Sequence, residues 1–311
     1  MARVYVVAPY LPHGGTFMAY HLARLLQLDF GFEAVAVTIG TETAANGVFV
    51  YDPVFPSIPL AALATTITDD DLLIANPSFS RFGLGFSCRG RKLMYIQGFT
   101  TYDVLDGGFD LYVCVSSFVR HFVQSLYGIS PPVIPPFVQR ETFPPPRPWS
   151  ERPEGRILVN NKGHTHRQEV LLNRVVTRLA AARPGLTFDL LSGEKEPQPA
   201  FAARLGAYRL LLSLAPAEGF GLIPLEAMAM GTTVVGFDGF GGVDYLRSGQ
   251  NCLAVPWPRL DDLIDSLLAL LDDPARAEAL AQEGQRTAAQ PCYTHAHFRA
   301  AWRPLLAALL G

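Results

Sequence analysis

The sequence predicts an α/β protein with two domains, and three observations support this fold class. Short apolar segments, typical of buried parallel strands, alternate with longer segments of helical periodicity. The chain has 311 residues, enough for two domains of ~150 residues each. A proline-dense stretch, residues 131–153, separates the two runs of alternating segments and predicts a stiff connector between the domains.

Composition and charge exclude several classes of protein. Hydrophobic residues make up 49% of the chain and charged residues 17%, which is typical of a globular protein rather than a disordered one. A net charge of -3 gives no electrostatic case for nucleic-acid binding. The four cysteines lie far apart, so neither a zinc site nor a disulfide framework is indicated. No signal-peptide pattern or apolar run of ~20 residues occurs, so we expect a cytoplasmic protein without an indicated membrane contact.

The first half begins with a βαβ unit. Val4–Ala8 is rich in β-branched residues and predicts a strand. Thr16 is a suitable cap for a helix that extends to about Leu28, and Gly31 ends that helix before a second strand, Ala34–Ile39. Parallel strands connected in this way bind ligands at their carboxyl edge, where His13-Gly14-Gly15 lies. An ordinary tight turn is the alternative interpretation of these two glycines.

Polar residues follow two later strands of this half. The strands are predicted at Leu72–Ala75, Leu93–Ile96 and Leu111–Val115. Gln97 directly follows the second of them and Ser116-Ser117 the third, so we expect these residues at the carboxyl edge of the sheet. Val119–Tyr127 is predicted to be a helix that ends at Gly128.

In the second half, the stretch from Leu210 to Gly231 carries the strongest signal for function. An apolar strand leads through a loop with two glycines, 217–221, into a helix. Such a turn directs backbone N–H groups and the positive end of the helix at one place, and this arrangement binds phosphate.

Two carboxylates, Glu218 in the loop and Glu226 in the expected first helical turn, flank this phosphate site with seven residues between them. A carboxylate beside a phosphate site repels the phosphate unless it binds hydroxyl groups, so the pair suggests a nucleotide sugar. The alternative is that both acids only favour a helix N-terminus, which contributes ~0.3–1 kcal/mol each.

The string E-G-F-G-L-x-x-L-E-A-M-A-x-G, residues 218–231, resembles the E-x7-E signature of retaining GT-B glycosyltransferases, in particular family 4. The resemblance implies two Rossmann-like domains that face each other across a cleft, and a C-terminal helix that returns to the N-terminal domain. It also implies transfer of a sugar from a nucleotide diphosphate sugar to a glycan, lipid or small-molecule acceptor, with retention at the anomeric carbon. No cofactor and no metal are expected.

The resemblance also implies roles for individual residues. Glu218 would have a catalytic role, and Glu226 would bind the donor. The other implied donor-binding residues are Gly219, Phe220, Gly221, Leu222, Gly14, Gly15 and Ser192, and the implied acceptor-binding residues are His13 and Gln97.

This sequence departs from the family pattern at several of these positions. Gln97 stands where family members often have a histidine, and Pro136-Phe137 replaces Asn-Gly. The family has an arginine followed five positions later by a lysine, whereas this chain has Lys162 and Arg167 in reversed order. Both remain cations, so the resemblance implies that they stabilise the leaving diphosphate. A solvated basic loop is the alternative.

Domain boundaries follow from these segments. We expect an N-terminal domain at residues 1–148, a C-terminal domain at 149–291, and a final helix at 292–311 that packs on the N-terminal domain. The further elements expected in the second half are strands at Arg156–Asn160, Leu186–Leu191 and Thr232–Phe237, and helices at Gln168–Ala182, Asp261–Leu271, Pro274–Ala288 and Tyr293–Leu310. A nucleotide-sugar epimerase, a phosphorylase and a catalytically silent nucleotide-sugar-binding protein remain alternatives to a transferase.

Overall fold

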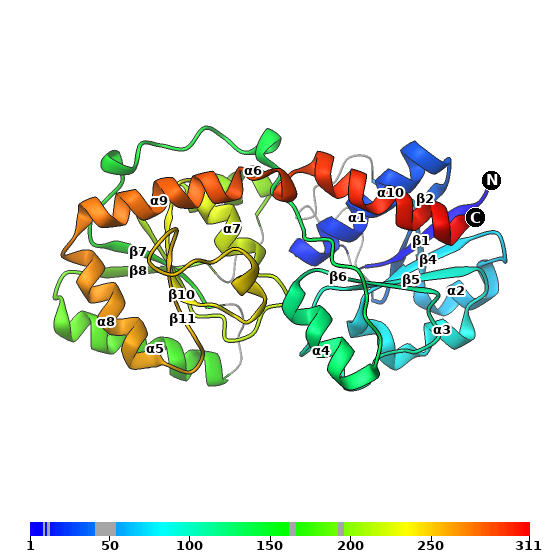
Figure 1. The fold of residues 1–311 in the computed structure, drawn as a ribbon, viewed down its shortest axis with the longest axis horizontal. Coiled ribbons are helices and arrows are strands. Elements are labelled where there is room, and N and C mark those ends of the chain that lie inside the picture. Colours follow the sequence, from blue (N-terminus) through cyan, green and yellow to red (C-terminus); the bar gives the residue numbers. More distant parts are fainter. Residues whose placement is uncertain (9, 11–12, 41–53, 162–165, 192–195) are drawn as a thin grey trace. The chain divides into compact units, whose positions relative to one another are not determined.

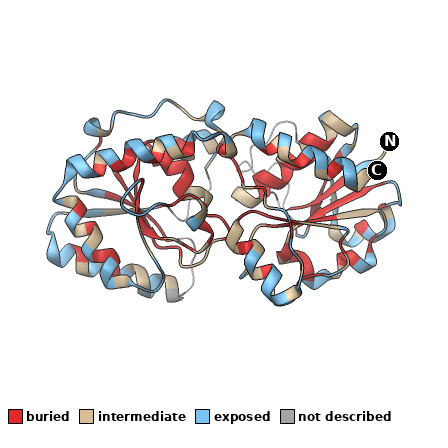
Figure 2. Cartoon of the chain, viewed as in Figure 1, coloured by how far each residue is buried: buried red, intermediate tan, exposed pale blue. Residues whose placement is uncertain are grey.

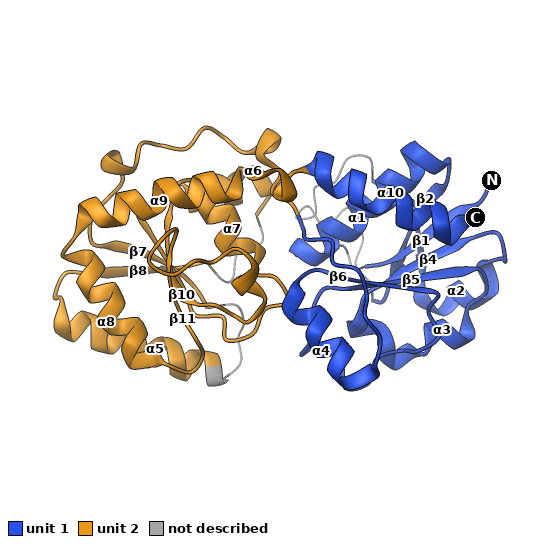
Figure 3. Ribbon diagram, viewed as in Figure 1, with its two compact units in different colours: residues 1–136, 295–311 blue, residues 137–294 orange. Residues whose placement is uncertain are grey.

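The computed structural model describes the chain except residues 9, 11–12, 41–53, 162–165 and 192–195 (Figure 1). It consists of two compact units (Figure 3). Unit 1 comprises Met1–Pro136 and His295–Gly311, and unit 2 comprises Phe137–Thr294. The boundaries expected from the sequence, after residues 148 and 291, therefore both fall within unit 2.

Packing of the proline-dense segment on unit 2 explains where the first boundary lies. The indole N–H of Trp149 donates to the carbonyl of Arg209 and to the hydroxyl of Thr233, both at 3.2 Å. Arg152 is buried and donates to carbonyl oxygens at three places of unit 2, in Tyr208, Met230 and Gly231. A stretch that proline keeps out of helices and sheets is thus held by side-chain hydrogen bonds instead.

Unit 1 contains a six-stranded parallel sheet in the order β3-β2-β1-β4-β5-β6. Its strands are β1 (Arg3–Val7), β2 (Glu33–Thr38), β3 (Ser57–Pro59), β4 (Leu72–Ala75), β5 (Arg91–Ile96) and β6 (Leu111–Cys114). The five strands predicted from apolar runs are confirmed. The short edge strand β3 was missed because it is only half buried and carries no apolar run.

Helices cover both faces of this sheet. They are α1 (Gly14–Phe30), α2 (Leu60–Thr66), α3 (Leu84–Ser87), α4 (Ser117–Tyr127) and α10 (His295–Leu310). In Figure 1, α1 and α10 lie on one side of the sheet and α2, α3 and α4 on the other. Helix α1 ends at Gly31 in the left-handed conformation, as predicted, but it begins at Gly14. The prediction of Thr16 as its cap is therefore wrong, since Thr16 is buried inside the helix.

The last helix completes the core of unit 1, which confirms the predicted return of the C-terminal helix. Trp302 is fully buried, and its ring packs edge-on against Tyr95 of β5 with centroids 5.1 Å apart. At the surface, Arg299 and Arg303 both pair with Asp29 at the end of α1. The hydrogen bonds from Arg299 hold the pKa of Asp29 below its usual value.

Unit 2 contains a five-stranded parallel sheet in the order β11-β10-β9-β7-β8. Its strands are β7 (Arg156–Asn160), β8 (Thr187–Leu190), β9 (Leu210–Ser213), β10 (Thr233–Phe237) and β11 (Leu253–Val255). The helices of unit 2 are α5 (His166–Ala182), α6 (Gln198–Leu205), α7 (Leu222–Ala229), α8 (Leu260–Leu271) and α9 (Pro274–Ala288).

The layers of unit 2 follow from the apolar faces of these elements. Strands β7, β9 and β10 are buried along almost their whole length, and α8 contributes apolar residues such as Leu263 and Leu267 to the same core. In Figure 2 the central strands are buried, while the outer faces of the helices are exposed. Within the described ranges, no helix has both the length and the apolar character needed to cross a membrane.

Candidate functional site

The strand order of unit 2 creates a switch point between β7 and β9. From β7 the chain passes through α5 to β8 on one side, and then through α6 to β9 on the other side of β7. At the carboxyl edge, the N–H of Leu214 donates to the carbonyl of Asn160 at 2.9 Å. Ligands of doubly wound sheets bind outside the carboxyl edge at such a switch point. The predicted Glu218 loop follows β9 directly, so it lies at this edge.

Two glycine-containing turns pack closely at this edge. The Glu218 N–H donates to the carbonyl of Gly239 at 2.7 Å, and the Gly241 N–H donates back to the carbonyl of Glu218 at 3.1 Å. A Cβ atom on Gly241 would lie 2.2 Å from the carbonyl oxygen of Gly219, so only glycine fits there. These contacts fix the backbone of Glu218, while its side chain is half-buried.

An aromatic cluster inside unit 2 supports the start of α7. Gly221 precedes the helix in the left-handed conformation, with φ of 83°. The hydroxyl of Tyr245 donates to the Gly221 carbonyl. The ring of Phe220 is buried against Tyr245 and Tyr293, with centroids 5.1 and 6.0 Å away. The Phe220 ring thus packs inside unit 2, so the ligand contact predicted for this residue would fall to its backbone.

Glu226 lies deeper than the sequence suggested. It is the fifth residue of α7, in the second turn rather than the first, and is 5% exposed. Burial raises its pKa to about 8, and a hydrogen bond with the Gln198 side chain partly offsets this shift. A buried, largely protonated carboxyl gains little from the positive end of a helix, so the interpretation as a simple first-turn acid does not fit.

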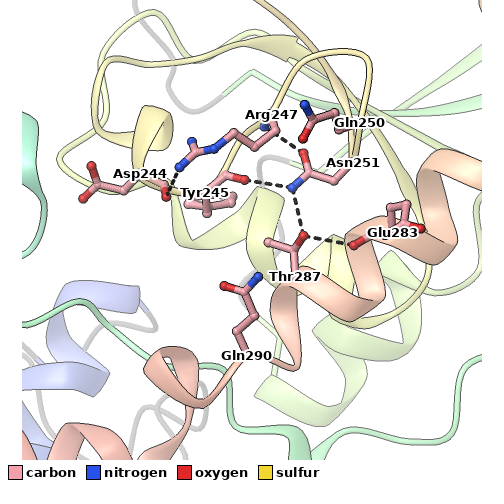
Figure 4. A pocket seen from close by; sticks show the side chains of 8 residues that line it. All are labelled: Asp244, Tyr245, Arg247, Gln250, Asn251, Glu283, Thr287 and Gln290. Carbon is pink, nitrogen blue, oxygen red and sulfur yellow. Dashed lines mark hydrogen bonds between the residues drawn. The ribbon is translucent and has the colours of Figure 1, made fainter.

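A cavity of about 470 Å³ lies behind Tyr245 (Figure 4). It is lined by Asp244, Tyr245, Arg247, Gln250, Asn251, Glu283, Thr287 and Gln290. The Asn251 amide donates to the Tyr245 carbonyl at 2.8 Å and to the Thr287 hydroxyl at 2.9 Å. None of the predicted site residues that the structure describes lines this cavity. Tyr245, whose hydroxyl donates to the Gly221 carbonyl, is instead among its lining residues.

The structure describes only part of the residues that the sequence predicts to contact the phosphates and the nucleotide. Lys162 and Ser192 lie outside the described residues. Arg167 is in the first turn of α5, which begins two residues earlier than the predicted Gln168, and its side chain is outside the described part. The structure therefore does not test the placement of these three side chains.

In unit 1, the structure brings the predicted Gly15 and Gln97 together at the carboxyl edge of the sheet. Gln97 follows β5, and its side-chain N–H donates to the carbonyl of Gly15 at 2.8 Å. A Cβ atom on Gly15 would lie 2.7 Å from the Gln97 amide oxygen, so the close approach depends on glycine. Gly14 and Gly15 form the first turn of α1, preceded by the exposed His13, and are not a separate tight turn.

Three polar residues near these sites were not predicted as functional. Tyr245 supports Gly221, Gln198 contacts Glu226, and Asn161 is buried directly after β7. For Asn161 a signal was present, because a polar residue that immediately follows a buried strand lies at the ligand-binding edge. Tyr245 and Gln198 act through tertiary contacts, which the sequence pattern does not show.

The comparison of sequences connects the second unit with known enzymes. Residues 198–287 match the family model described as glycosyl transferases group 1. Over 78 residues the chain is 38% identical to the D-inositol 3-phosphate glycosyltransferase of Rhodococcus opacus. Over 111 residues it is 33% identical to the GtfA subunit of UDP-N-acetylglucosamine–peptide N-acetylglucosaminyltransferase of Streptococcus parasanguinis. These matches cover 25% and 35% of this chain but only 18% and 20% of the two relatives.

Solved structures extend the likeness to both units. HepE from Anabaena, solved with UDP and glucose, has a TM-score of 0.76 at 13% identity, and the match covers 99% of this chain and 100% of HepE. A glycosyltransferase from Rickettsia africae has a TM-score of 0.73 at 14% identity, with 99% and 98% coverage. Such low identity compares the fold alone. The chain therefore has the GT-B fold, and its residues 198–287 are similar to the group 1 glycosyl transferases.

Proposed function

We propose that this protein transfers a sugar from a nucleotide diphosphate sugar to an acceptor hydroxyl with retention of configuration. One observation carries the proposal. The loop with Glu218 follows β9 at the switch point of unit 2, and α7, which contains the buried Glu226, begins at the end of this loop, inside the segment that matches the family. A loop that presents backbone N–H groups beside two carboxyl groups suits a ligand with phosphates at its centre and hydroxyl groups on both sides.

Each part of the donor has a proposed partner in unit 2. The backbone of Gly219–Leu222 would bind the diphosphate, and Glu226 would accept hydrogen bonds from the ribose hydroxyls. Glu218 would bind hydroxyls of the transferred sugar, and Ser192 would lie near the nucleotide. A helix N-terminus stabilises anions by its N–H groups and its dipole, which supports the placement of the diphosphate at α7.

In this proposal, Lys162, Arg167 and these N–H groups stabilise the negative charge of the leaving diphosphate. No metal or cofactor is required. Cations that are already positioned where negative charge develops lower the barrier of such a reaction. Treatment of the active protein with EDTA tests this part of the proposal. Activity that is lost with EDTA and restored by a divalent cation would contradict it.

The acceptor is assigned to unit 1, where His13 and Gln97 lie at the carboxyl edge beside Gly14 and Gly15. The side-chain N–H of Gln97 is already bonded to Gly15, so its amide oxygen is the atom proposed to accept a hydrogen bond from the acceptor hydroxyl. Glycan, lipid and small-molecule acceptors all carry such a hydroxyl.

UDP is the first nucleotide to test, because HepE and the pneumococcal GtfA were solved with UDP. The protein would be incubated with UDP-glucose or UDP-N-acetylglucosamine and a panel of acceptors, with release of UDP as the readout. The configuration of the product would be read by NMR, where an α-linked product from the α-linked donor supports retention. Epimerisation of the donor, phosphate-dependent cleavage, or binding without turnover would each support an alternative function instead.

A further inference from the structure

Asn161 is a buried polar residue with a side-chain oxygen that is unpaired among the residues that the structure describes. It directly follows β7 and is 3% exposed. Its amide oxygen, Oδ1, is buried and has no hydrogen-bond partner within the described part of the chain. Most buried polar side-chain atoms are paired, because an unpaired one loses its hydration without compensation. The protein therefore retains an unfavourable group at this position.

The preceding residue shows how an asparagine is normally accommodated here. Asn160 is also 3% exposed, but its side-chain N–H donates to the hydroxyl of Ser213 on β9 at 3.4 Å. Its carbonyl also accepts from the N–H of Leu214. Asn160 is thus the last residue of β7 that takes part in the sheet, and Asn161 is the first beyond it.

This position coincides with the proposed donor site. Asn161 lies at the carboxyl edge of β7, on the strand that borders the switch point, and β9 on the other side of that point leads to Glu218. Ligands of doubly wound sheets bind at this location, outside the carboxyl ends of the strands. An unpaired acceptor at a ligand-binding edge is therefore explained if the ligand supplies its partner.

We propose that Oδ1 of Asn161 accepts a hydrogen bond from a hydroxyl group of the bound nucleotide sugar, an inference that rests on the proposed function. Phosphate oxygens are acceptors themselves, so they offer nothing to a second acceptor. Hydroxyl groups are donors and occur on the ribose and on the transferred sugar. The unfavourable group in the free protein is thereby satisfied in the complex, and Asn161 contributes to selective binding of hydroxyl-bearing ligands.

The test compares ligands that differ in their hydroxyl groups. Binding of UDP-glucose, UDP and inorganic diphosphate would be measured by calorimetry for the wild-type protein and for Asn161→Leu and Asn161→Ala. Loss of one hydrogen bond should weaken binding of UDP-glucose roughly three- to ten-fold in both variants. An equal loss with UDP places the partner on the nucleoside part of the ligand, and a loss confined to UDP-glucose places it on the transferred sugar. Binding of inorganic diphosphate should not change.

Thermal stability of the free proteins provides an independent readout. Replacement of an unpaired buried amide by an apolar side chain should leave the melting temperature of Asn161→Leu unchanged or raise it. Asn160→Ala is the matched control, since it removes a paired amide and leaves the Ser213 hydroxyl without this partner, so its melting temperature should fall. If Asn161 instead has a structural role, the melting temperatures of Asn161→Leu and Asn160→Ala should both fall, and ligand binding should not change.

The outcomes separate this inference from the proposed function. If the wild-type protein binds UDP-glucose and both Asn161 variants bind it equally well, the inference is wrong and the proposed function stands. If the variants lose affinity for inorganic diphosphate by the same factor, Asn161 acts on phosphate and the inference is also wrong. If the wild-type protein binds no nucleotide sugar from a panel of UDP, GDP, ADP and dTDP sugars, the proposed function itself fails.

Discussion

The hydroxyl of Tyr245 donates a hydrogen bond to the carbonyl oxygen of Gly221, the residue from which α7 begins. Together with the hydrogen bond from the Gly241 N–H to the Glu218 carbonyl, this contact connects the 3-10 helix at Gly241–Asp244 with the turn that is proposed to bind the diphosphate. Because Asn251 in turn donates to the Tyr245 carbonyl, the position of α7 depends on side chains outside the proposed donor contacts.

Tyr245→Phe should therefore impair donor binding without removing a ligand contact. The variant leaves the buried Gly221 carbonyl unpaired, which costs ~1–3 kcal/mol. We expect a lower melting temperature and a higher KM for the donor. Tyr293→Phe is the control, because it belongs to the same aromatic cluster but its hydroxyl interacts with Cys292. Equal effects of the two variants on KM would show that the hydrogen bond to Gly221 has no special role.

Glu226 predicts a pH-dependent stability. Its pKa in the folded protein is about 8, whereas an unfolded glutamate has a pKa of ~4.3. Between these values the unfolded chain loses the proton and the folded protein keeps it, so stability should fall as pH rises and level off above about 8. Glu226→Gln removes this group, and the difference between the two melting curves should grow across this window. Parallel pH profiles would contradict the raised pKa.

Donor binding should release protons if Glu226 binds the ribose. Hydrogen bonds from ribose hydroxyls favour the ionised carboxylate, so the pKa of Glu226 should fall in the complex and a proton should leave near neutral pH. Calorimetry of UDP binding in two buffers with different ionisation enthalpies measures this proton. Glu226→Ala should weaken UDP binding roughly ten- to a hundred-fold and abolish the buffer dependence. Binding without proton release would argue against the ribose contact.

Glu218 is expected to affect turnover more than nucleotide binding. Its side chain is half-buried, and its backbone is fixed by Gly239 and Gly241, so Glu218→Gln should fold normally. If Glu218 binds the transferred sugar, kcat should fall on the order of 10²-fold, while affinity for UDP without a sugar stays close to that of the wild type. A similar loss of affinity for UDP and UDP-glucose would place Glu218 elsewhere on the donor.

Gly15 and Gln97 should be energetically coupled. An alanine at position 15 would push its Cβ into the Gln97 amide, break the hydrogen bond to the Gly15 carbonyl and cost about 1 kcal/mol. In the Gln97→Ala background the same substitution should be neutral or stabilising, because alanine favours a helix more than glycine does. A double-mutant cycle in urea unfolding measures the coupling. Additive effects would show that the two residues act independently.

The sequence predicted the elements whose signal is local. Apolar runs identified β1, β4 and β9, and Gly31 marked the end of α1. The glycine loop after β9 was likewise predicted at the correct place, because a strand, two glycines and a helix follow one another directly in the chain.

Properties that depend on distant residues were not predictable in this way. The burial of Glu226 depends on the packing around α7 and on Gln198, a residue 28 positions earlier in the chain. The first domain boundary was placed too late because proline density suggested an independent connector. Arg152 and Trp149 make contacts with residues more than fifty positions away, and these contacts assign the segment to unit 2.

The placement of Trp302 has a consequence for the order in which the protein matures. During synthesis, α10 emerges after the whole of unit 2, yet Trp302 fills the core of unit 1 beside Tyr95. The apolar core of unit 1 therefore stays incomplete until α10 is synthesised. Unit 2, which is continuous in the chain, can fold before that. A truncation that removes Trp302 and the residues after it would expose that core. Unit 1, which is synthesised first, would then be the more aggregation-prone of the two units.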